Sequence, residues 1–254
     1  MSRRGPMCEG GCYMPHLCSG TPSACLMRPR AYYPMFADLT GRRCVVVGGG
    51  MVAQRKVTTL LGYGARITVV SPQITRRLSG YARRGRIRHV ARRVRPADLR
   101  GAWLVYAATD DRRINRLVHR AAQRMRIFAN VVDQTPLCSF IAPAIVRRGP
   151  LTIAVSTGGA SPSLAKKIRS DIDRQIGQRY APVLKLLAGL RGAAKRKLPR
   201  YQDRKRYFDR VVRGRVVELA RTGRSVAARQ EALALLEQDV RHHANGGTKH
   251  QIRS

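Results

Sequence analysis

Residues 44–53 read CVVVGGGMVA, and this stretch decides the fold. The run Cys44–Val47 has the length and apolar character of a short buried strand. Three glycines follow it directly, and helical spacing of apolar residues then runs from Val52 to Leu61. A strand, the pattern Gly-x-Gly-x-x-Ala and a helix in this order are typical of a dinucleotide-binding β-α-β unit. We therefore predict such a unit over Arg42–Ser71.

Each small residue of this turn has a physical task. Gly48 allows the tight turn, Gly50 lets backbone N–H groups approach a pyrophosphate, and Ala53 keeps helix and strand close together. The N-terminus of the helix adds partial positive charge for the anion. The predicted pyrophosphate contacts are Gly48, Gly49, Gly50, Met51 and Val52.

The second strand, predicted over Ile67–Val70, lacks the acidic residue that commonly binds the adenosine ribose at this point. Ser71, Pro72 and Gln73 stand there instead, and we predict that Ser71 or backbone groups contact the ribose. Arg76 and Arg77 follow and could accept a 2′-phosphate, so the residues leave NAD and NADP open.

Strand and helix patterns continue to alternate up to Phe140, which predicts a parallel sheet covered on both faces. After Phe140 the pattern changes to two apolar strands, a Gly-Ser loop and then helical spacing to the end. The predicted later elements are strands 87–90, 103–108, 127–132, 141–146 and 151–155, a turn at Arg147–Pro150, helix 114–125, a helix from Pro162, and helices beyond Gly177.

The chain carries 50 Lys and Arg against 14 Asp and Glu, a formal net charge of +36. Such a field attracts polyanions, nucleic acid among them. The arginines are spread in ones and twos rather than gathered with aromatic residues as in a single-strand groove. A proteome-wide bias toward Arg, or adaptation to an unusual milieu, explains this distribution at least as well.

The six cysteines divide into two groups. Cys44 and Cys138 sit in apolar surroundings and are predicted core residues. Cys8, Cys12, Cys18 and Cys25 crowd the start of the chain at spacings that match no zinc pattern, so a metal site and a disordered extension with Met35 as working start stay open. The chain has neither an apolar run of membrane-spanning length nor a secretory signal, so we expect a cytoplasmic protein.

Four segments together resemble the precorrin-2 dehydrogenase / sirohydrochlorin ferrochelatase family, the N-terminal module of siroheme synthase. They are Val45–Ala53 with Arg55-Lys56, Ala107–Asp111, Asn130–Asp133, and Ser139–Ile141 through Ser156–Pro162. The resemblance covers about residues 35–215. It implies an α/β fold: a Rossmann-type parallel sheet, then a small α+β dimerisation region and a helical C-terminal domain. The expected parts are a disordered extension 1–34, an NAD-binding domain 35–141, a dimerisation region 142–176, a helical domain 177–240 and a tail 241–254.

The resemblance implies that NAD removes two hydrogens from precorrin-2 to give sirohydrochlorin, with insertion of Fe²⁺ left open. It favours NAD over NADP and implies a homodimer. The catalytic residue is predicted to be Asp133, which matches the family's aspartate and follows the carboxyl end of a parallel strand. A turn cap is the alternative reading of Asp133. Thr109 is predicted beside the cofactor, and Asp110 or Asp111 as the N-cap of the next helix.

The predicted substrate contacts gather at a glycine-serine loop before a helix N-terminus, which suits a substrate with eight carboxylates. Simple capping by Ser161 is the alternative there. No resident metal site is predicted. The alternative function is a dinucleotide-sensing regulator that binds nucleic acid through its basic surface. The predicted substrate contacts are Asn130, Ser156, Thr157, Gly158, Gly159 and Ser161.

Overall fold

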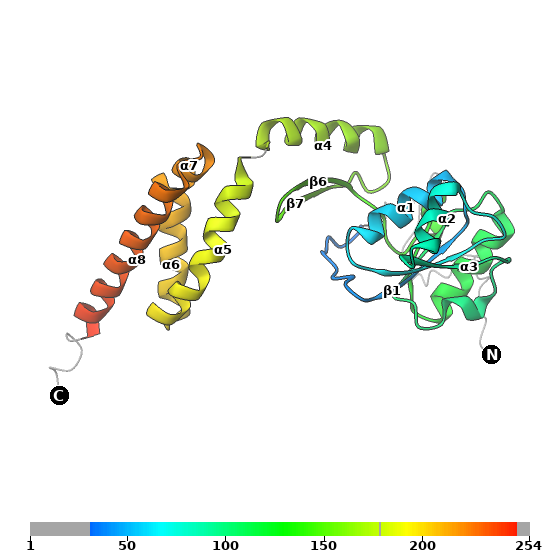
Figure 1. Cartoon of the computed structure of the whole chain (residues 1–254), viewed down its shortest axis with the longest axis horizontal. Coiled ribbons are helices and arrows are strands. Elements are labelled where there is room, and N and C mark those ends of the chain that lie inside the picture. Colours follow the sequence, from blue (N-terminus) through cyan, green and yellow to red (C-terminus); the bar gives the residue numbers. More distant parts are fainter. Residues whose placement is uncertain (1–30, 178, 248–254) are drawn as a thin grey trace, which may run out of the picture. The chain divides into compact units, whose positions relative to one another are not determined.

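A computed structural model of the chain describes residues 31–177 and 179–247 (Figure 1). The predictions for the cysteine-rich first 25 residues therefore lie outside the described residues. Within the described part, no helix combines the length and the apolar character needed to cross a membrane.

The first part is a five-stranded sheet in the order β3-β2-β1-β4-β5, with every neighbouring pair parallel. This arrangement confirms the predicted Rossmann-type sheet. Because β1 lies between β2 and β4, the chain extends the sheet from β1 first on one side, through β2 and β3, and then on the other side, through β4 and β5. The strands are β1 Arg43–Val47, β2 Arg66–Val70, β3 Ile87–Val90, β4 Leu104–Ala107 and β5 Phe128–Val131.

Alternate residues of β1 enter two different cores, because successive side chains of a strand point to opposite faces. Val45 and Val47 pack in the core that contains Val118 of α3, whereas Cys44 and Val46 pack with α1 and α2. The sheet is thus covered on both faces, as predicted. The helices of this part are α1 Met51–Leu61, α2 Arg76–Arg83 and α3 Arg112–Arg124, with the short 3₁₀ turns η1 Pro96–Leu99 and η2 Thr135–Leu137.

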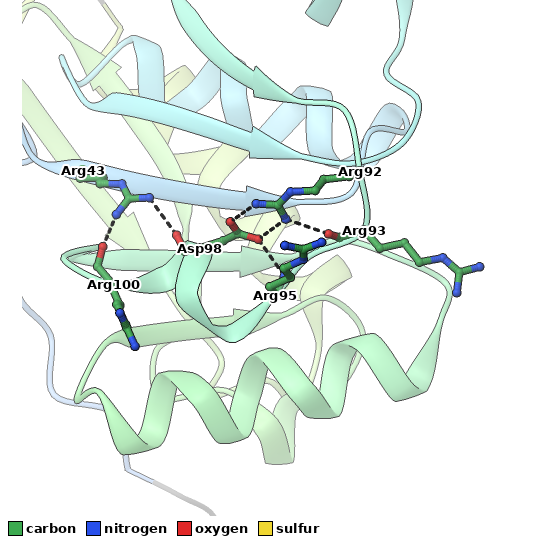
Figure 2. A network of polar contacts seen from close by, with 6 residues as sticks. All are labelled: Arg43, Arg92, Arg93, Arg95, Asp98 and Arg100. Carbon is green, nitrogen blue, oxygen red and sulfur yellow. Dashed lines mark hydrogen bonds and ion pairs between the residues drawn. The ribbon is translucent and has the colours of Figure 1, made fainter.

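The arginine-rich segment after β3 is tied down by one carboxylate (Figure 2). Arg92 makes a two-pronged pair with Asp98, at 2.7 Å and 2.8 Å. The backbone N–H of Arg95 also donates to Asp98, at 2.7 Å. Arg43 of β1 donates to the backbone carbonyls of Asp98 and Arg100. These arginines therefore hold η1 against β1 instead of forming a free basic patch.

The second part contains an antiparallel pair of strands, β6 Ala144–Arg148 and β7 Leu151–Val155, followed by α4 Pro162–Ile176. Arg148 of β6 pairs with Asp173 of α4 at 2.6 Å. The prediction that Arg147 and Arg148 form the turn is wrong, since both lie in β6. The turn is made by Gly149 and Pro150, because Gly149 adopts φ +57°, which glycine tolerates without strain.

The last part is helical, as predicted. Tyr207 and Leu236 are buried at its centre, and the Tyr207 hydroxyl donates to the Ala232 carbonyl at 3.0 Å. Val212, in the same helical part, is 52% exposed. The last helix continues to Gly247, past the point where we placed the start of a tail. The helices are α5 Tyr180–Lys197, α6 Tyr201–Arg213, α7 Arg215–Arg221 and α8 Ser225–Gly247.

Candidate functional site

The candidate site lies at the carboxyl edge of the parallel sheet. The glycine turn follows β1, and the loops after β2 and β4 flank it because those strands pair with β1 on either side. The strand order reverses at this point, which is where open α/β sheets bind their ligands. The predicted cofactor residues are therefore brought together.

Gly48 is locked between the two neighbouring strands. Its backbone N–H donates to the Val70 carbonyl at 3.0 Å, and the Ala108 N–H donates to the Val47 carbonyl at 2.8 Å. Gly48 has φ +115°, and a Cβ there would lie 2.1 Å from the Ala108 carbonyl oxygen. Only glycine fits this position.

Gly49 contacts the loop after β2. A Cβ on Gly49 would lie 1.8 Å from the Gln73 carbonyl oxygen and 2.9 Å from the Ser71 hydroxyl. That hydroxyl donates to the Gln73 carbonyl at 2.7 Å, and the Thr75 N–H donates to the Gly49 carbonyl at 3.0 Å. The segment Ser71–Gln73 is thus held against the glycine turn. Sequence reasoning missed Thr75, whose hydroxyl also bonds the Gln54 side chain at 2.7 Å.

Gly50 differs from the other two glycines because its α-carbon faces open space. A Cβ there would meet no atom within 4 Å. Gly50 is the N-cap of α1, no side chain caps this end, and the first turn holds no acidic residue. Such an uncapped N-terminus offers N–H groups and partial positive charge to an anion. The turn therefore fits the pyrophosphate of a dinucleotide.

The loop after β4 is ordered by Asn115, which is 2% exposed. The Thr109 hydroxyl donates to the Asn115 side-chain oxygen at 3.0 Å, and the Asn115 amide donates to the Thr109 carbonyl at 3.0 Å. The methyl group of Thr109 would stand 3.3 Å from a Cβ on Gly48. Thr109 therefore borders the glycine turn.

The cap of α3 is Asp111. Its carboxylate accepts from the N–H groups of Arg113 at 2.7 Å and Ile114 at 3.2 Å. The hydrogen bond from the Ile114 N–H, followed by that from Arg113, lowers the pKa of Asp111. The sequence left open which of Asp110 and Asp111 caps α3, and the structure assigns the cap to Asp111.

Asp133 is exposed just beyond the carboxyl end of β5. Thr109, which follows β4, lies at the same edge of the sheet. It adopts φ +58°, within a turn closed by the Gln134 N–H and the Val131 carbonyl at 3.2 Å. A left-handed backbone is uncommon for a residue other than glycine, although Asp tolerates it best with Asn and His. The chain therefore changes direction sharply at the carboxyl edge of the sheet.

The predicted substrate residues differ in how far their side chains are already engaged. Asn130 is buried, and its amide donates to the Phe140 carbonyl at 3.0 Å. Ser156 accepts from the Gly158 N–H at 3.1 Å, and Thr157 accepts from the Ser161 N–H at 3.1 Å. These contacts order the loop internally.

Ser161 is the N-cap of α4 and accepts from the Leu164 N–H at 3.2 Å, which bears out the capping alternative. A Cβ on Gly159 would lie 3.3 Å from the Thr135 methyl group. The glycine-serine loop therefore runs past the segment that follows Asp133.

Two further features lie near the sheet. Cys44 and Cys138 are buried, as predicted for core residues, and neither takes part in a disulfide within the described residues. Burial raises the pKa of the Cys44 thiol to about 11. Lys56 of α1 is half-buried, with Nζ 4.9 Å from the centroid of the Tyr106 ring. Lys56 lies three residues after Ala53 and four before Leu60, both of which are buried on the inward face of the helix.

Three family models match consecutive segments of the chain. They are described as putative NAD(P)-binding over residues 35–144, sirohaem biosynthesis protein central over 148–175, and sirohaem synthase dimerisation region over 179–236. A siroheme synthase of Methylobacillus flagellatus is 44% identical over 196 residues, which are 77% of this chain and 42% of that protein. The chain belongs to the siroheme synthase family.

A second siroheme synthase and a solved structure are also similar to the chain. A siroheme synthase of Thioalkalivibrio sulfidiphilus is 41% identical over 216 residues, 85% of this chain and 44% of that protein. The chain thus spans under half the length of these curated relatives. The solved structure of SirC, precorrin-2 dehydrogenase, is similar at 27% identity and a TM-score of 0.68, covering 82% of this chain and all of that one. None of the matched family descriptions concerns nucleic acid.

Within the family description, the word dimerisation falls on the helical segment 179–236. Our prediction placed the dimer contact in 142–176. The description of the first segment names NAD(P) without choosing between the two dinucleotides.

Proposed function

We propose that this chain is a dehydrogenase that oxidises precorrin-2 to sirohydrochlorin with NAD. The observation that carries the proposal is the placement of an exposed carboxylate, Asp133, on the same sheet edge as a glycine turn that is open at Gly50. The similarity to a solved precorrin-2 dehydrogenase supports the choice of substrate.

The reaction removes a hydride and a proton from the substrate. Bound NAD supplies the hydride acceptor, and a base must take the proton. The Asp133 carboxylate is the proposed base, because it stands at the crevice edge and is exposed to water, to which it can pass the proton on. Loss of one hydride and one proton accounts for the two hydrogens removed.

For the cofactor, the proposal assigns the pyrophosphate to the Gly48–Val52 turn and the adenosine ribose to Ser71–Gln73. We favour NAD because of the resemblance described above. Arg77 donates to the hydroxyl of Tyr81, one turn later on the same helix, at 3.2 Å, so its guanidinium lies along α2. Arg76 is exposed and is the residue to test for a contact with a 2′-phosphate.

For the substrate, the proposal uses the glycine-serine loop and the N-terminus of α4. The hydroxyls of Ser156, Thr157 and Ser161 already make hydrogen bonds within the loop. The backbone N–H groups and the dipole of a helix without acidic residues in its first turn would then attract the carboxylates. Asn130 would act by holding the Phe140 segment in place.

The chain is further proposed to work as a cytoplasmic homodimer. The two-stranded sheet of β6 and β7 supports this, because an isolated hairpin is marginal in water and gains stability from a partner. Iron insertion is left as an outcome to be measured.

The test mixes purified protein with precorrin-2 and NAD⁺ and follows sirohydrochlorin by absorbance. Asp133→Asn should lower kcat at least about a hundredfold, the usual size of a general-base effect, while NAD⁺ still binds. Glu237→Gln, an exposed change on α8, is the matched control. A parallel reaction with NADP⁺ and Arg76→Ala tests the cofactor choice, and added Fe²⁺ tests chelation. Full activity in Asp133→Asn would refute the role of the base.

A further inference from the structure

We propose that His89 is a positioning residue for the adenosine ribose of the dinucleotide. Its ring holds the backbone carbonyl of Ser71 and so fixes the segment that stands in place of the usual acidic residue. This inference rests on the proposed function, because it takes Ser71–Gln73 as the ribose contact. It adds a side chain from β3 to the part of the site that follows β2.

The ring of His89 reaches from β3 to the end of β2. Nε2 of His89 lies 2.9 Å from the Ser71 carbonyl oxygen. A carbonyl oxygen only accepts hydrogen bonds, so Nε2 carries the proton in this contact. His89 is half-buried and lies on the same face of β3 as Ile87, which is buried in the sheet's core. The contact is therefore made at the carboxyl edge of the sheet, beside the glycine turn.

The peptide unit between Ser71 and Pro72 can be held only through its oxygen. Proline has no backbone N–H, so this unit offers an acceptor and no donor. Ser71 is 9% exposed, and a carbonyl without a partner at such a place costs free energy. The hydrogen bond from His89 satisfies that carbonyl and fixes the tilt of the peptide unit.

Two further hydrogen bonds hold Ser71. Its N–H donates to the Val90 carbonyl at 3.1 Å, and its hydroxyl donates to the Gln73 carbonyl at 2.7 Å. Because the hydroxyl hydrogen is directed at Gln73, the lone pairs of the hydroxyl oxygen can accept from a ribose hydroxyl. In the common form of this fold a carboxylate supplies the acceptor at this point. Ser71 is thus oriented as an uncharged acceptor in place of the acid.

His89 acts on the ribose through Ser71 rather than by touching it. The far end of the segment is fixed separately, by the Thr75 N–H that donates to the Gly49 carbonyl at 3.0 Å. Without the ring of His89, the chain from Ser71 to Gln73 loses its anchor at the β2 end. A hydrogen bond between two hydroxyls depends on direction, so the ribose contact weakens. The pyrophosphate contact at the glycine turn does not depend on His89.

The first test measures NAD⁺ binding to the full-length protein by calorimetry and needs no precorrin-2. His89→Leu should lower the NAD⁺ affinity about fivefold, the size of one lost hydrogen bond. His89→Gln should stay within about twofold of wild type, because its amide nitrogen lies as many bonds from Cα as Nε2 and can donate to the same carbonyl. Wild-type affinity in His89→Leu, or an equal loss in His89→Gln, overturns the proposal.

His119→Leu is the matched control. His119 of α3 is also half-buried, and its Nδ1 lies 2.9 Å from the Leu137 carbonyl oxygen. This variant loses the same kind of contact away from β2, so its NAD⁺ affinity should stay within about twofold of wild type. A loss as large as that of His89→Leu would show that affinity follows general stability, and the proposal would be wrong. If His89→Leu does not fold, His89→Thr replaces it, since threonine suits a strand but is too short to reach Ser71.

The second test shows whether the effect reaches the ribose. An NAD⁺ analogue with 2′-deoxyadenosine lacks one of the ribose hydroxyls. Wild type should bind this analogue about fivefold more weakly than NAD⁺, whereas His89→Leu should bind the two ligands within about twofold of each other. Equal discrimination in both proteins, or none in wild type, overturns the proposal. A protein that responds as expected but does not oxidise precorrin-2 would refute the proposed function and leave the role of His89 standing.

Discussion

The carbonyl oxygen of Gln73 lies where a side chain on Gly49 would begin, only 1.8 Å from the position of a Cβ. This contact joins the loop after β2 to the turn after β1. It explains why three consecutive glycines occur here, although the dinucleotide pattern requires only the first and third of them. Gly48 and Gly49 serve the packing of the protein itself, and Gly50 leaves space for a ligand.

The three glycines should therefore respond differently to one added methyl group. Gly49→Ala must push the Gln73 backbone aside and should lower the free energy of unfolding by about 2 kcal/mol or more. Gly50→Ala should stay within about 0.5 kcal/mol of wild type, because Gly50 has φ −79° and open space around its Cβ. Its NAD affinity should nevertheless fall at least about tenfold, since the methyl group enters the proposed pyrophosphate site. Thermal unfolding and calorimetric NAD titration separate the two effects. Wild-type affinity in Gly50→Ala would count against the cofactor assignment.

The two aspartates after β4 offer a second matched pair. Asp111→Ala removes the carboxylate that accepts from the N–H groups of Arg113 and Ile114, so the first turn of α3 loses its cap. We expect a melting temperature lower by about 2–4 °C. Asp110→Ala should leave it unchanged. Equal losses in the two variants would show that the effect comes from charge rather than capping.

The Asp98 network in Figure 2 predicts a pH-dependent contribution to stability. Hydrogen bonds from Arg92 lower the pKa of Asp98 in the folded protein. The stabilisation is therefore fully present above the unfolded value of about 3.9 and is lost as the pH falls through the folded value. Because the Arg92 side chain is 39% exposed, Asp98→Asn should cost only about 1 kcal/mol at pH 7.

The measurement is chemical unfolding of wild type and Asp98→Asn between pH 7 and pH 3. Their difference should stay constant down to about pH 5 and begin to narrow below about pH 4. Asp171→Asn, which breaks an exposed pair with Lys167 on α4, is the control and should leave the unfolding midpoint unchanged. A difference between wild type and Asp98→Asn that does not narrow at all between pH 4 and pH 3 would show that shape rather than charge holds η1.

Local signals were sufficient to predict the sheet. Val-rich runs, a glycine turn in its strand-helix context and one carboxylate after a strand each depend on neighbours within a few residues. They placed the five parallel strands, with Asp133 and Thr109 on the same sheet edge. The helix α2 escaped this reasoning because its sequence is dominated by arginine, and only Leu78, Gly80 and Tyr81 are buried.

Long-range contacts could not be predicted in the same way. Whether Asp110 or Asp111 caps α3 depends on backbone angles, and the role of Asp98 depends on Arg43, which lies 55 residues earlier in the sequence. The end of β6 was predicted two residues too early, because Arg147 and Arg148 look like turn residues in the sequence. In the structure these two arginines form the end of the strand.

The last prediction concerns the surface through which two copies associate. Leu164 and Ile168 lie one turn apart on α4 and are 49% and 37% exposed. Burying such a pair against a second copy would cover apolar surface beside the two-stranded sheet. We expect a dimer in sedimentation at micromolar concentration, and a monomer after Leu164→Glu with Ile168→Glu.

Val212→Glu is the matched variant in the helical region that the family description names for dimerisation. Val212 is 52% exposed on α6, so a charge there should not disturb the fold. If the contact lies on α4, this variant stays dimeric. If Val212→Glu dissociates the dimer and the α4 double variant does not, the contact belongs to residues 179–236 and our placement in 142–176 is wrong. Circular dichroism of each variant keeps a loss of folding distinct from a loss of association.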